Sequence, residues 1–423
     1  MKVFKFGGAS VKEANAVKNV ASIVSLFKGE KLAIVVSAMG KTTNAMEEIA
    51  EAVWKRDHKG FMERVEERRD FHLQIINDLF PDPNTSIYGL VNGEFDKLLK
   101  MFNEQVPDNF DFEYDQIVSM GEVVSTLIVS AYLNETGISS AWADARTIIR
   151  TNNKYREAEI DWIKTEALFA TKFMPVYNDV EVQVTQGFIG HTSEGLTTTL
   201  GREGSDFTAG IIAYCCNAED VTIWKDVPGM LNADPKWFDN TIKLDRISFR
   251  EAIELSYYGA SVIHPKTVKP LQNKQIPLYV KSFIDPEASG TVIQSSTSQD
   301  HLIPSFIFKM NQVLFSITPK DFSFLVEKNL SDIFDRISKA KAKINLMQNS
   351  ALNFSILLDE EKVNIDEILE LFQDAYDVKF NNGLELVTIR HYDQATIDRV
   401  TVDKIVLLEQ KTRETARLVV KQK

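Results

Sequence analysis

The sequence predicts an α/β protein followed by a smaller α+β unit. In the first two thirds of the chain, short apolar strands alternate with helical segments, and glycine-containing loops follow several of the strands. In the last third, the elements follow the order βαββαβ, which is the order of a ferredoxin-like fold. At 423 residues the chain is too long for one hydrophobic core, so we expect two or three domains.

The composition is that of a globular protein without a nucleic-acid or membrane partner. The net charge of −12 opposes non-specific binding to nucleic acid. The chain begins without a signal-peptide core and contains no run of about 18 apolar residues, so we expect a cytoplasmic protein. Cys215 and Cys216 are neighbours in an apolar helical run, which indicates buried thiols and neither a disulfide nor a zinc site.

The first strand, Lys2–Phe6, leads into Gly7, Gly8 and a helix. Glycines at this turn let backbone amides approach a phosphate, and Lys5 supplies a positive charge for it. Many purely structural βα units begin in the same way. The residues alone therefore leave a phosphate site and a structural turn as alternatives.

The second strand, Leu32–Val36, ends in residues 37–43, which resemble the end of a P-loop. The leading glycine of that motif would fall at Val35, inside the strand, so we reject a P-loop. Thr43 can present a hydroxyl group to a ligand or belong to the cap of the next helix. We expect helices at 45–80 and 91–102, and strands at 140–143, 174–177 and 182–188.

An apolar helix at 114–133 is interrupted near Ser119 and carries Glu122 among apolar neighbours. A carboxylate in such a helix is costly to bury unless it has a partner. The partner of Glu122 could be a structural arginine or the amino group of a ligand.

The central motif begins with three threonines at 197–199 and continues through a turn into an apolar helix. The threonines predict a strand, and we expect Ser205 or Asp206 to cap the helix. The N-terminus of this helix and Arg202 suit an anionic ligand, because backbone N–H groups and a guanidinium both bind carboxylate or phosphate. An ordinary capped turn with a surface arginine is the alternative.

A strand at 221–224 runs into a loop that contains Lys225, Asp226 and, further on, Lys236. Loops at the C-terminal ends of strands hold ligands in α/β folds, and these charges suit a nucleotide; a solvated loop is the alternative. His264 has no metal partner at ligand spacing, so we take it as structural and assign no metal ligand.

Five segments, in this order along the first two thirds of the chain, resemble the aspartate kinase family. They are residues 5–10, 186–190, 197–206, 226–229 and 259–265, and the threonine-to-aspartate string at 197–206 is the most specific of them. The resemblance implies the amino-acid-kinase fold, a mainly parallel sheet sandwiched by helices. It also implies transfer of the γ-phosphoryl group of ATP, with Mg²⁺, to the side chain of L-aspartate, the first step toward lysine, threonine and methionine.

The resemblance also implies residue roles. The phosphates would be held by Lys5, Gly7 and Gly8, the aspartate by Thr43, Glu122, Arg202 and Ser205, and the nucleotide by Lys225, Asp226 and Lys236. Lys5 and Asp206 would be catalytic, with Asp206 orienting Lys5 or a metal-bound water. No general base is needed, because an aspartate side chain with a pKa of about 3.9 is already ionised at neutral pH.

Three positions depart from the family pattern: Glu203 replaces a loop glycine, Ser261 replaces a lysine and Leu231 replaces an aromatic residue. Lys266 could supply the missing cation. These departures keep open a catalytically impaired, amino-acid-sensing partner subunit, and a kinase for another acidic amino acid is a further alternative.

The predicted domains are a kinase region at 1–284, a linker at 285–303 with a short strand at 291–293, and a regulatory region at 304–423. In the regulatory region we expect strands at 313–317, 344–348, 352–358 and 384–389 and helices at 331–339 and 365–375. After an aspartate kinase, this pattern resembles an ACT domain. We expect dimerisation through its sheet edges.

After Arg390, a strand at 402–408 and a helix at 412–419 are too little for a second complete ACT unit. The glycine that the family places in its effector loop is also absent, with Glu327, Lys328 and Asn329 in that region. We therefore do not expect feedback inhibition by lysine or threonine.

Overall fold

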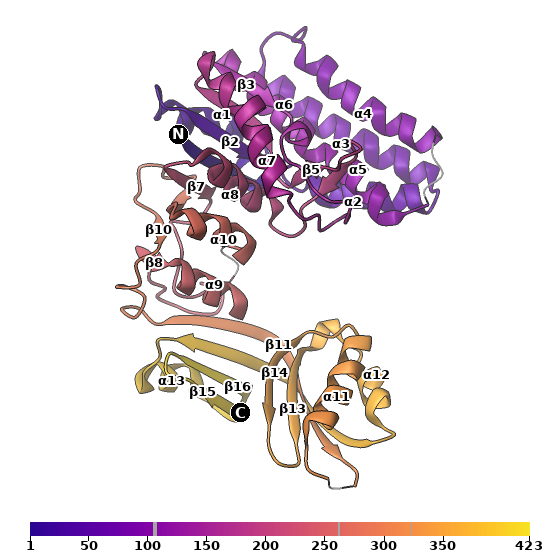
Figure 1. Ribbon diagram of the computed structural model, residues 1–423, viewed down its shortest axis with the longest axis vertical. Coiled ribbons are helices and arrows are strands. Elements are labelled where there is room, and N and C mark those ends of the chain that lie inside the picture. The colour runs from indigo at the N-terminus through magenta and orange to yellow at the C-terminus, as the bar shows by residue number, and fades with distance from the viewer. Residues whose placement is uncertain (105–107, 261–262, 322) are drawn as a thin grey trace. The chain divides into compact units, whose positions relative to one another are not determined.

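The computed structural model describes residues 1–104, 108–260, 263–321 and 323–423. The chain forms two compact units (Figure 1). The first unit comprises Met1–Met230, Lys243–Ser256 and Ser261–Asp300, and the second comprises Leu231–Ile242, Tyr257–Ala260 and His301–Lys423.

The first unit contains an eight-stranded sheet in which only the β9–β10 pair is antiparallel among the described strands. This confirms the predicted mainly parallel sheet. In spatial order the strands are β3 (Ser140–Ala143), β4 (Val182–Gln186), β2 (Leu32–Val36), β1 (Lys2–Phe6), β7 (Asp220–Lys225), β9 (Leu278–Ser282), β10 (Thr291–Gln294) and β8 (Arg246–Ser248). A separate hairpin joins β5 (Ile189–His191) to β6 (Thr197–Thr199).

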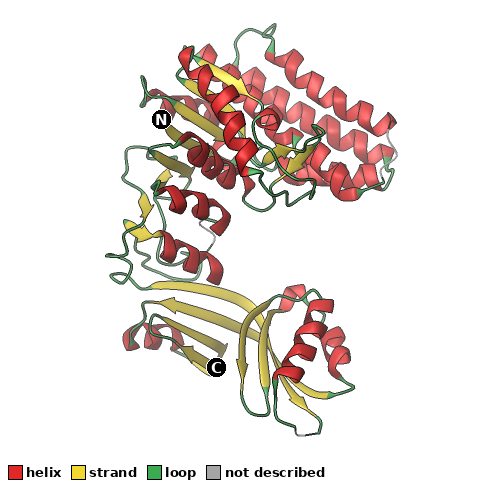
Figure 2. Ribbon diagram, viewed as in Figure 1, coloured by secondary structure: helices red, strands yellow, loops and turns green. Residues whose placement is uncertain are grey.

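Helices cover both faces of this sheet (Figure 2). The helices are α1 (Ala14–Ser25), α2 (Thr42–Trp54), α3 (His58–Leu79), α4 (Ile87–Glu104), α5 (Phe110–Val118), α6 (Met120–Glu135), α7 (Trp162–Leu168), α8 (Gly204–Cys216), α9 (Phe249–Tyr258) and α10 (Pro265–Lys274). Phe4 and Phe6 of β1 pack into one core with α1 to α6. The side chain of Lys5 points to the opposite face, where α8 packs on β1 and α10 packs on α8.

The α5–α6 segment, Phe110–Glu135, is the one stretch of the described residues that is long and apolar enough to cross a bilayer. Of its most apolar window, 78% is buried inside the protein, as in a core helix. The helix breaks at Ser119, where the sequence predicted an interruption.

The second unit begins with the predicted βαββαβ order. Its elements are β11 (Ser305–Pro319), α11 (Glu327–Lys339), β12 (Ile344–Asn349), β13 (Phe354–Asp359), α12 (Ile365–Phe372) and β14 (Tyr376–Arg390), followed by α13 (Gln394–Thr401), β15 (Lys404–Lys411) and β16 (Thr415–Gln422). The antiparallel sheet has the order β12-β13-β11-β14-β16-β15. The first four strands have the 2-3-1-4 arrangement of a ferredoxin-like fold, with α11 and α12 on one face, which confirms the predicted ACT-type fold.

Two predicted elements were wrong. Residues 174–177 form a 3₁₀ helix, Met174–Asn178, because Pro175 lacks the N–H that a strand would need. Residues 412–419, predicted as a helix, include most of β16, which pairs with β14 and β15. Its neighbouring residues Leu418 and Val419 are buried in two different cores on opposite faces of the sheet. Because both faces of this strand are buried, its sequence is apolar without the alternation of a half-exposed strand, and such a run can be mistaken for a helix.

Candidate active site

A cavity of about 790 Å³ in the first unit contains most of the predicted functional side chains. It lies where α8 begins and where β1, β2 and β7 end. Seven predicted residues line it: Lys5, Thr43, Glu122, Arg202, Ser205, Asp206 and Lys225. Arg202 and Lys5, which the sequence places almost 200 residues apart, thus line a single cavity.

Lys5 and Asp206 form a buried ion pair. The Lys5 Nζ lies 2.7 Å from the Asp206 Oδ1, and the two residues are 9% and 3% exposed. A Cβ atom at Gly7 would lie 3.3 Å from the Lys5 Nζ, so the glycine turn passes beside the ammonium group. A Cβ at Gly8 would lie 2.7 Å from the Ala38 carbonyl oxygen, so this position requires glycine. Gly8 is thus required by its packing against the Ala38 carbonyl group, and Gly7 passes beside the Lys5 ammonium group; neither glycine lines the cavity, so their phosphate-binding role stays a prediction.

The start of α8 differs from the predicted cap. The helix begins at Gly204, and its N-cap is Glu203 in the left-handed conformation with φ of 55°, without a side-chain cap bond. Ser205 and Asp206 lie in the first turn and are not the cap. Their N–H groups lack intrahelical partners, as in any first turn, and this end of the helix carries a partial positive charge.

Gly187 allows α8 to begin at this place. A Cβ at Gly187 would lie 2.4 Å from the Ser205 Cβ, closer than any side chain could approach. The close approach sets Ser205 at the wall of the cavity, where its side chain is largely buried. The packing of Gly187 against Ser205 thus explains why the segment 186–190 contains a glycine at this position.

Glu122 lies in the first turn of α6 and is 2% exposed. Its Oε1 accepts one long hydrogen bond from the Ala38 N–H at 3.3 Å, and its Oε2 has no partner among the described residues. Burial raises the pKa of Glu122 to about 8, and the Ala38 N–H opposes this shift.

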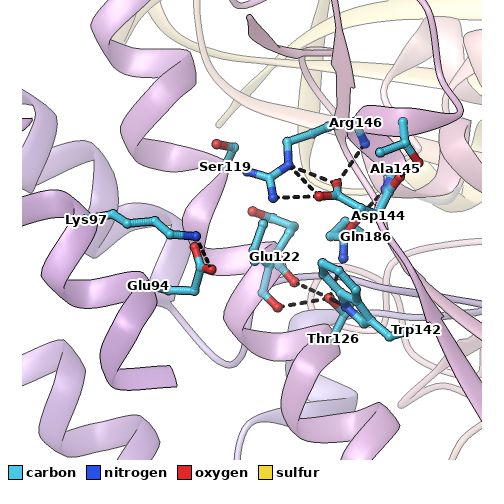
Figure 3. Close-up of polar contacts among 12 residues, drawn as sticks. Glu94, Lys97, Ser119, Glu122, Thr126, Trp142, Asp144, Ala145, Arg146 and Gln186 are labelled. Atoms are coloured by element: carbon cyan, nitrogen blue, oxygen red, sulfur yellow. Dashed lines mark hydrogen bonds and ion pairs between the residues drawn. The ribbon is translucent and has the colours of Figure 1, made fainter. Parts of the chain in front are cut away.

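The polar groups behind Glu122 bond to one another (Figure 3). The Thr126 Oγ1 accepts from the Trp142 Nε1 at 2.9 Å and from the Gln186 Nε2 at 2.7 Å, and the Gln186 Oε1 accepts from the Ala145 N–H. None of these bonds reaches the Glu122 carboxylate. A buried carboxylate with an open oxygen beside a cavity suits a cationic group of a ligand.

Three predicted nucleotide or cation residues do not line this cavity. Asp226 is exposed just after β7, and Lys236 is exposed in the second unit, so their nucleotide roles stay predictions. Lys266 lines a different cavity of about 520 Å³ with Trp162. Ser261 lies outside the described residues.

Sequence reasoning missed part of the cavity wall, namely Ser37, Glu47, Asp111, Tyr114, Lys154, Tyr155, Arg156, Glu157, Phe188 and Gly201. Ser37 follows the C-terminal end of a parallel strand, a position that could have indicated it. Tyr114 donates a hydrogen bond from its hydroxyl to the Glu47 Oε1 at 2.6 Å, and the guanidinium of Arg156 lies 4.3 Å from the Tyr114 ring centroid. These contacts join segments that no sequence pattern relates.

The chain is similar in sequence to proteins of known family. The model of the Amino acid kinase family matches residues 1–282. The chain is 32% identical over 363 residues to lysine-sensitive aspartokinase 3 of Escherichia coli, covering 84% of this chain and 78% of that one. It is 30% identical over 403 residues to the chloroplastic aspartokinase 1 of Arabidopsis thaliana, covering 92% of this chain and 70% of that one.

A solved structure also matches both units. The crystal structure of E. coli aspartokinase III in complex with aspartate and ADP aligns with a TM-score of 0.80 at 27% identity, over 99% of this chain and 96% of that one. Because the family model covers about two thirds of the chain and curated aspartokinases match most of it, this chain belongs to the amino acid kinase family, and within it to the aspartokinases.

Proposed function

We propose that this chain is an aspartate kinase, which transfers the γ-phosphoryl group of ATP to the side-chain carboxylate of L-aspartate and forms 4-phospho-L-aspartate. The observation that carries this proposal is the single cavity that Lys5 and Arg202 both line. One end offers charge for a phosphate and the other offers partners for an amino acid. The complex of E. coli aspartokinase III with aspartate and ADP supports the same pair of ligands.

In this proposal the amino acid occupies the part of the cavity between Arg202 and Glu122. Arg202 pairs with the α-carboxylate, because a guanidinium binds a carboxylate through two parallel hydrogen bonds. Glu122 pairs with the α-ammonium group, which supplies the partner that its Oε2 lacks among the described residues. The hydroxyl groups of Thr43 and Ser205 add hydrogen bonds.

The phosphates of ATP lie beside Lys5, Gly7 and Gly8 and face the first turn of α8. Lys5 and the N–H groups of this turn stabilise the negative charge of the transferring group. Lys225 and Asp226 contact the rest of the nucleotide, and the predicted role of Lys236, which belongs to the second unit, stays a prediction.

The described residues contain no cluster of three His, Cys, Asp or Glu side chains that could hold a metal ion. In kinase sites Mg²⁺ is held largely by phosphate oxygens and water with one or two carboxylates, and Asp206 would orient a water bound to that metal. When bound, Mg²⁺ neutralises phosphate charge.

The chain's own residues act by position and charge. The aspartate side chain is ionised at neutral pH, so no residue has to remove a proton from the nucleophile. The main obstacle is the repulsion between a carboxylate and a polyphosphate. Lys5 reduces this repulsion, Asp206 fixes the direction of the Lys5 ammonium group through their 2.7 Å ion pair, and Arg202 holds the amino acid in line with the phosphate.

Aspartate-dependent formation of ADP by the purified full-length protein tests the proposal. Lys5→Met should lower kcat by about 10³-fold or more, because it removes the cation at the reacting phosphate. Lys2→Met is the matched control: it removes an ion pair of the same strand, with Asp220 at 2.9 Å, outside the cavity. An active Lys5→Met enzyme would remove the assigned role of Lys5.

The same assay separates the alternatives. ADP formation with glutamate or N-acetylglutamate, but not with aspartate, would identify a kinase for another acidic amino acid. Aspartate binding without ADP formation would identify an amino-acid-sensing partner subunit, to which Glu203 and Leu231 would then contribute.

We further propose a kinase region at 1–284 and an ACT-type regulatory region at 304–423 in a cytoplasmic protein. The segment 285–303, predicted as a linker, contributes β10 to the sheet of the first unit. Dimerisation would use the edge strands β12 and β15, because unpaired edges of a sheet accept further strands. Light scattering of the purified protein measures the number of chains per particle.

We expect no inhibition of the kinase activity by lysine or threonine, alone or together, and inhibition at physiological concentrations would contradict this expectation.

A further inference from the structure

The carboxylate of Asp115 lies behind the cavity wall and is completely buried in α5. Its Oδ1 accepts a hydrogen bond from the Thr199 Oγ1 at 2.6 Å, and its Oδ2 accepts one from the Thr199 N–H at 2.8 Å. The Arg156 N–H donates to both oxygens, at 3.1 and 3.0 Å. All three donors are uncharged groups, and they come from two segments distant in the sequence.

The first of these segments leads directly to Arg202. Thr199 is the last residue of β6, and Gly201, with φ of 76°, turns the chain before Arg202. A hydrogen bond to Thr199 therefore fixes the chain three residues before the guanidinium group.

The second segment supports the first. Arg156 has a left-handed φ of 67°, and its N–H points at the Asp115 carboxylate. The Ala158 N–H donates to the Thr199 carbonyl oxygen at 2.9 Å, and a Cβ at Gly201 would lie 3.2 Å from the Arg156 carbonyl oxygen. The two segments thus lie side by side, and Asp115 holds both.

The helix that carries Asp115 leads to Glu122. α5 ends at Val118, and after Ser119 the chain enters α6, which holds Glu122 in its first turn. We propose that Asp115 is a positioning residue that sets the spacing between Arg202 and Glu122, and thereby the fit of the α-carboxylate and α-ammonium groups of an amino acid. The inference rests on the proposed function, since this spacing matters only if the cavity binds an amino acid.

Gln116 offers a matched control on the same helix. Its Nε2 donates to the Thr197 carbonyl oxygen at 2.8 Å, and its Oε1 accepts from the Thr197 N–H at 3.3 Å. These bonds hold the opposite end of β6, two residues further from Arg202. Gln116→Ala therefore loosens the same strand without touching the residues next to the guanidinium.

The experiment compares Asp115→Asn, Thr199→Val and Thr199→Ser with Gln116→Ala in the full chain. Thr199→Val keeps the shape but removes the hydroxyl donor, and Thr199→Ser keeps the donor. For Asp115→Asn and Thr199→Val we expect the KM for aspartate to rise by about tenfold or more, with kcat and the KM for ATP within about threefold of wild type. Thr199→Ser and Gln116→Ala should stay within about threefold of the wild-type KM.

Binding of aspartate, measured by calorimetry, and the melting temperature of each variant complete the test. An equal rise of KM in Gln116→Ala, or an unchanged KM in folded Asp115→Asn and Thr199→Val, would overturn the positioning role. If the wild type forms no ADP with aspartate while Thr199→Val still weakens aspartate binding, the proposed function fails and the positioning role stands.

Discussion

The end of α5 and the start of α6 each bury a carboxylate, and the protein treats the two in opposite ways. Asp115 of α5 accepts hydrogen bonds from three donor groups, whereas Glu122 of α6 accepts one long bond and leaves its Oε2 without a partner among the described residues. Burial raises the pKa of both, to about 6 for Asp115 and about 8 for Glu122. The fold itself supplies hydrogen-bond donors to both oxygens of the first carboxylate, and it leaves one oxygen of the second without a donor among the described residues.

Of the effects that bear on this comparison, the largest expected is the weakening of amino-acid binding when Glu122 is replaced by glutamine. Glu122→Gln should weaken aspartate binding by about 100-fold, close to 3 kcal/mol, because an ammonium group in a buried site loses its counter-ion. Calorimetric titration of aspartate measures the change. Glu113→Gln is the control, since Glu113 is also buried but does not line the cavity, and it should bind aspartate like the wild type. Unchanged aspartate binding by Glu122→Gln would show that the Glu122 carboxylate does not pair with the ligand.

The next effect is a dependence of aspartate binding on pH. With a pKa of about 8, Glu122 is protonated in the free protein at neutral pH and must release its proton when it pairs with an ammonium group. Affinity for aspartate should therefore rise by up to about tenfold per pH unit between pH 6 and 8. Titrations in two buffers of different ionisation enthalpy detect the released proton. Glu122→Gln should show neither effect, and proton release by that variant would contradict the assignment.

Replacing the two carboxylates by amides should change the free energy of unfolding in opposite directions. Asp115→Asn should lower the free energy of unfolding by about 1–3 kcal/mol at pH 8, because the amide nitrogen cannot accept from the Arg156 and Thr199 donors.

Glu122→Gln should not lower it. The folded state holds the Glu122 proton up to pH 8, whereas the unfolded state loses it near 4.5, so this group lowers the stability of the wild type as pH rises through that window. The advantage of Glu122→Gln should therefore grow between pH 5 and 8, as measured by urea denaturation. A constant difference would mean that Glu122 is not buried as described.

The smallest expected effect concerns a third carboxylate, Glu203, which is neither supplied with donors like Asp115 nor assigned to an amino acid like Glu122. Its φ of 55° favours glycine, the residue that the family pattern has there, and its carboxylate adds negative charge to the cavity. Glu203→Gly should raise the free energy of unfolding by about 0.5–1 kcal/mol and lower the KM for ATP a few-fold.

Gln275→Gly, at φ of 57° after α10 and outside the cavity, is the control. It should alter stability by a similar amount and leave the KM for ATP unchanged. If both substitutions lower that KM equally, the charge of Glu203 has no part in nucleotide binding.

Much of the fold was predictable because its signals are local. The strands Lys2–Phe6 and Leu32–Val36 have the bounds that the sequence indicated, since each is a short, largely apolar run followed by turn residues. The errors occur where distant contacts override the pattern, as in β16, whose two faces enter different cores. The cap of α8 was also wrong, because the helix start depends on the close approach of Gly187 to Ser205.

The sequence by itself determined the types of residue available in and around the cavity: the lysine near the end of the first strand, the glycine turn, the arginine loop and the two carboxylates near Ser119. Only the tertiary structure decided which of the two carboxylates has hydrogen-bond donors for both of its oxygens. The donors of Asp115 lie 41 and 84 residues away, and the single donor of Glu122 lies 84 residues away. Hydrogen bonding of a buried group depends on atoms within about 3 Å, and the chain brings such atoms together only by folding.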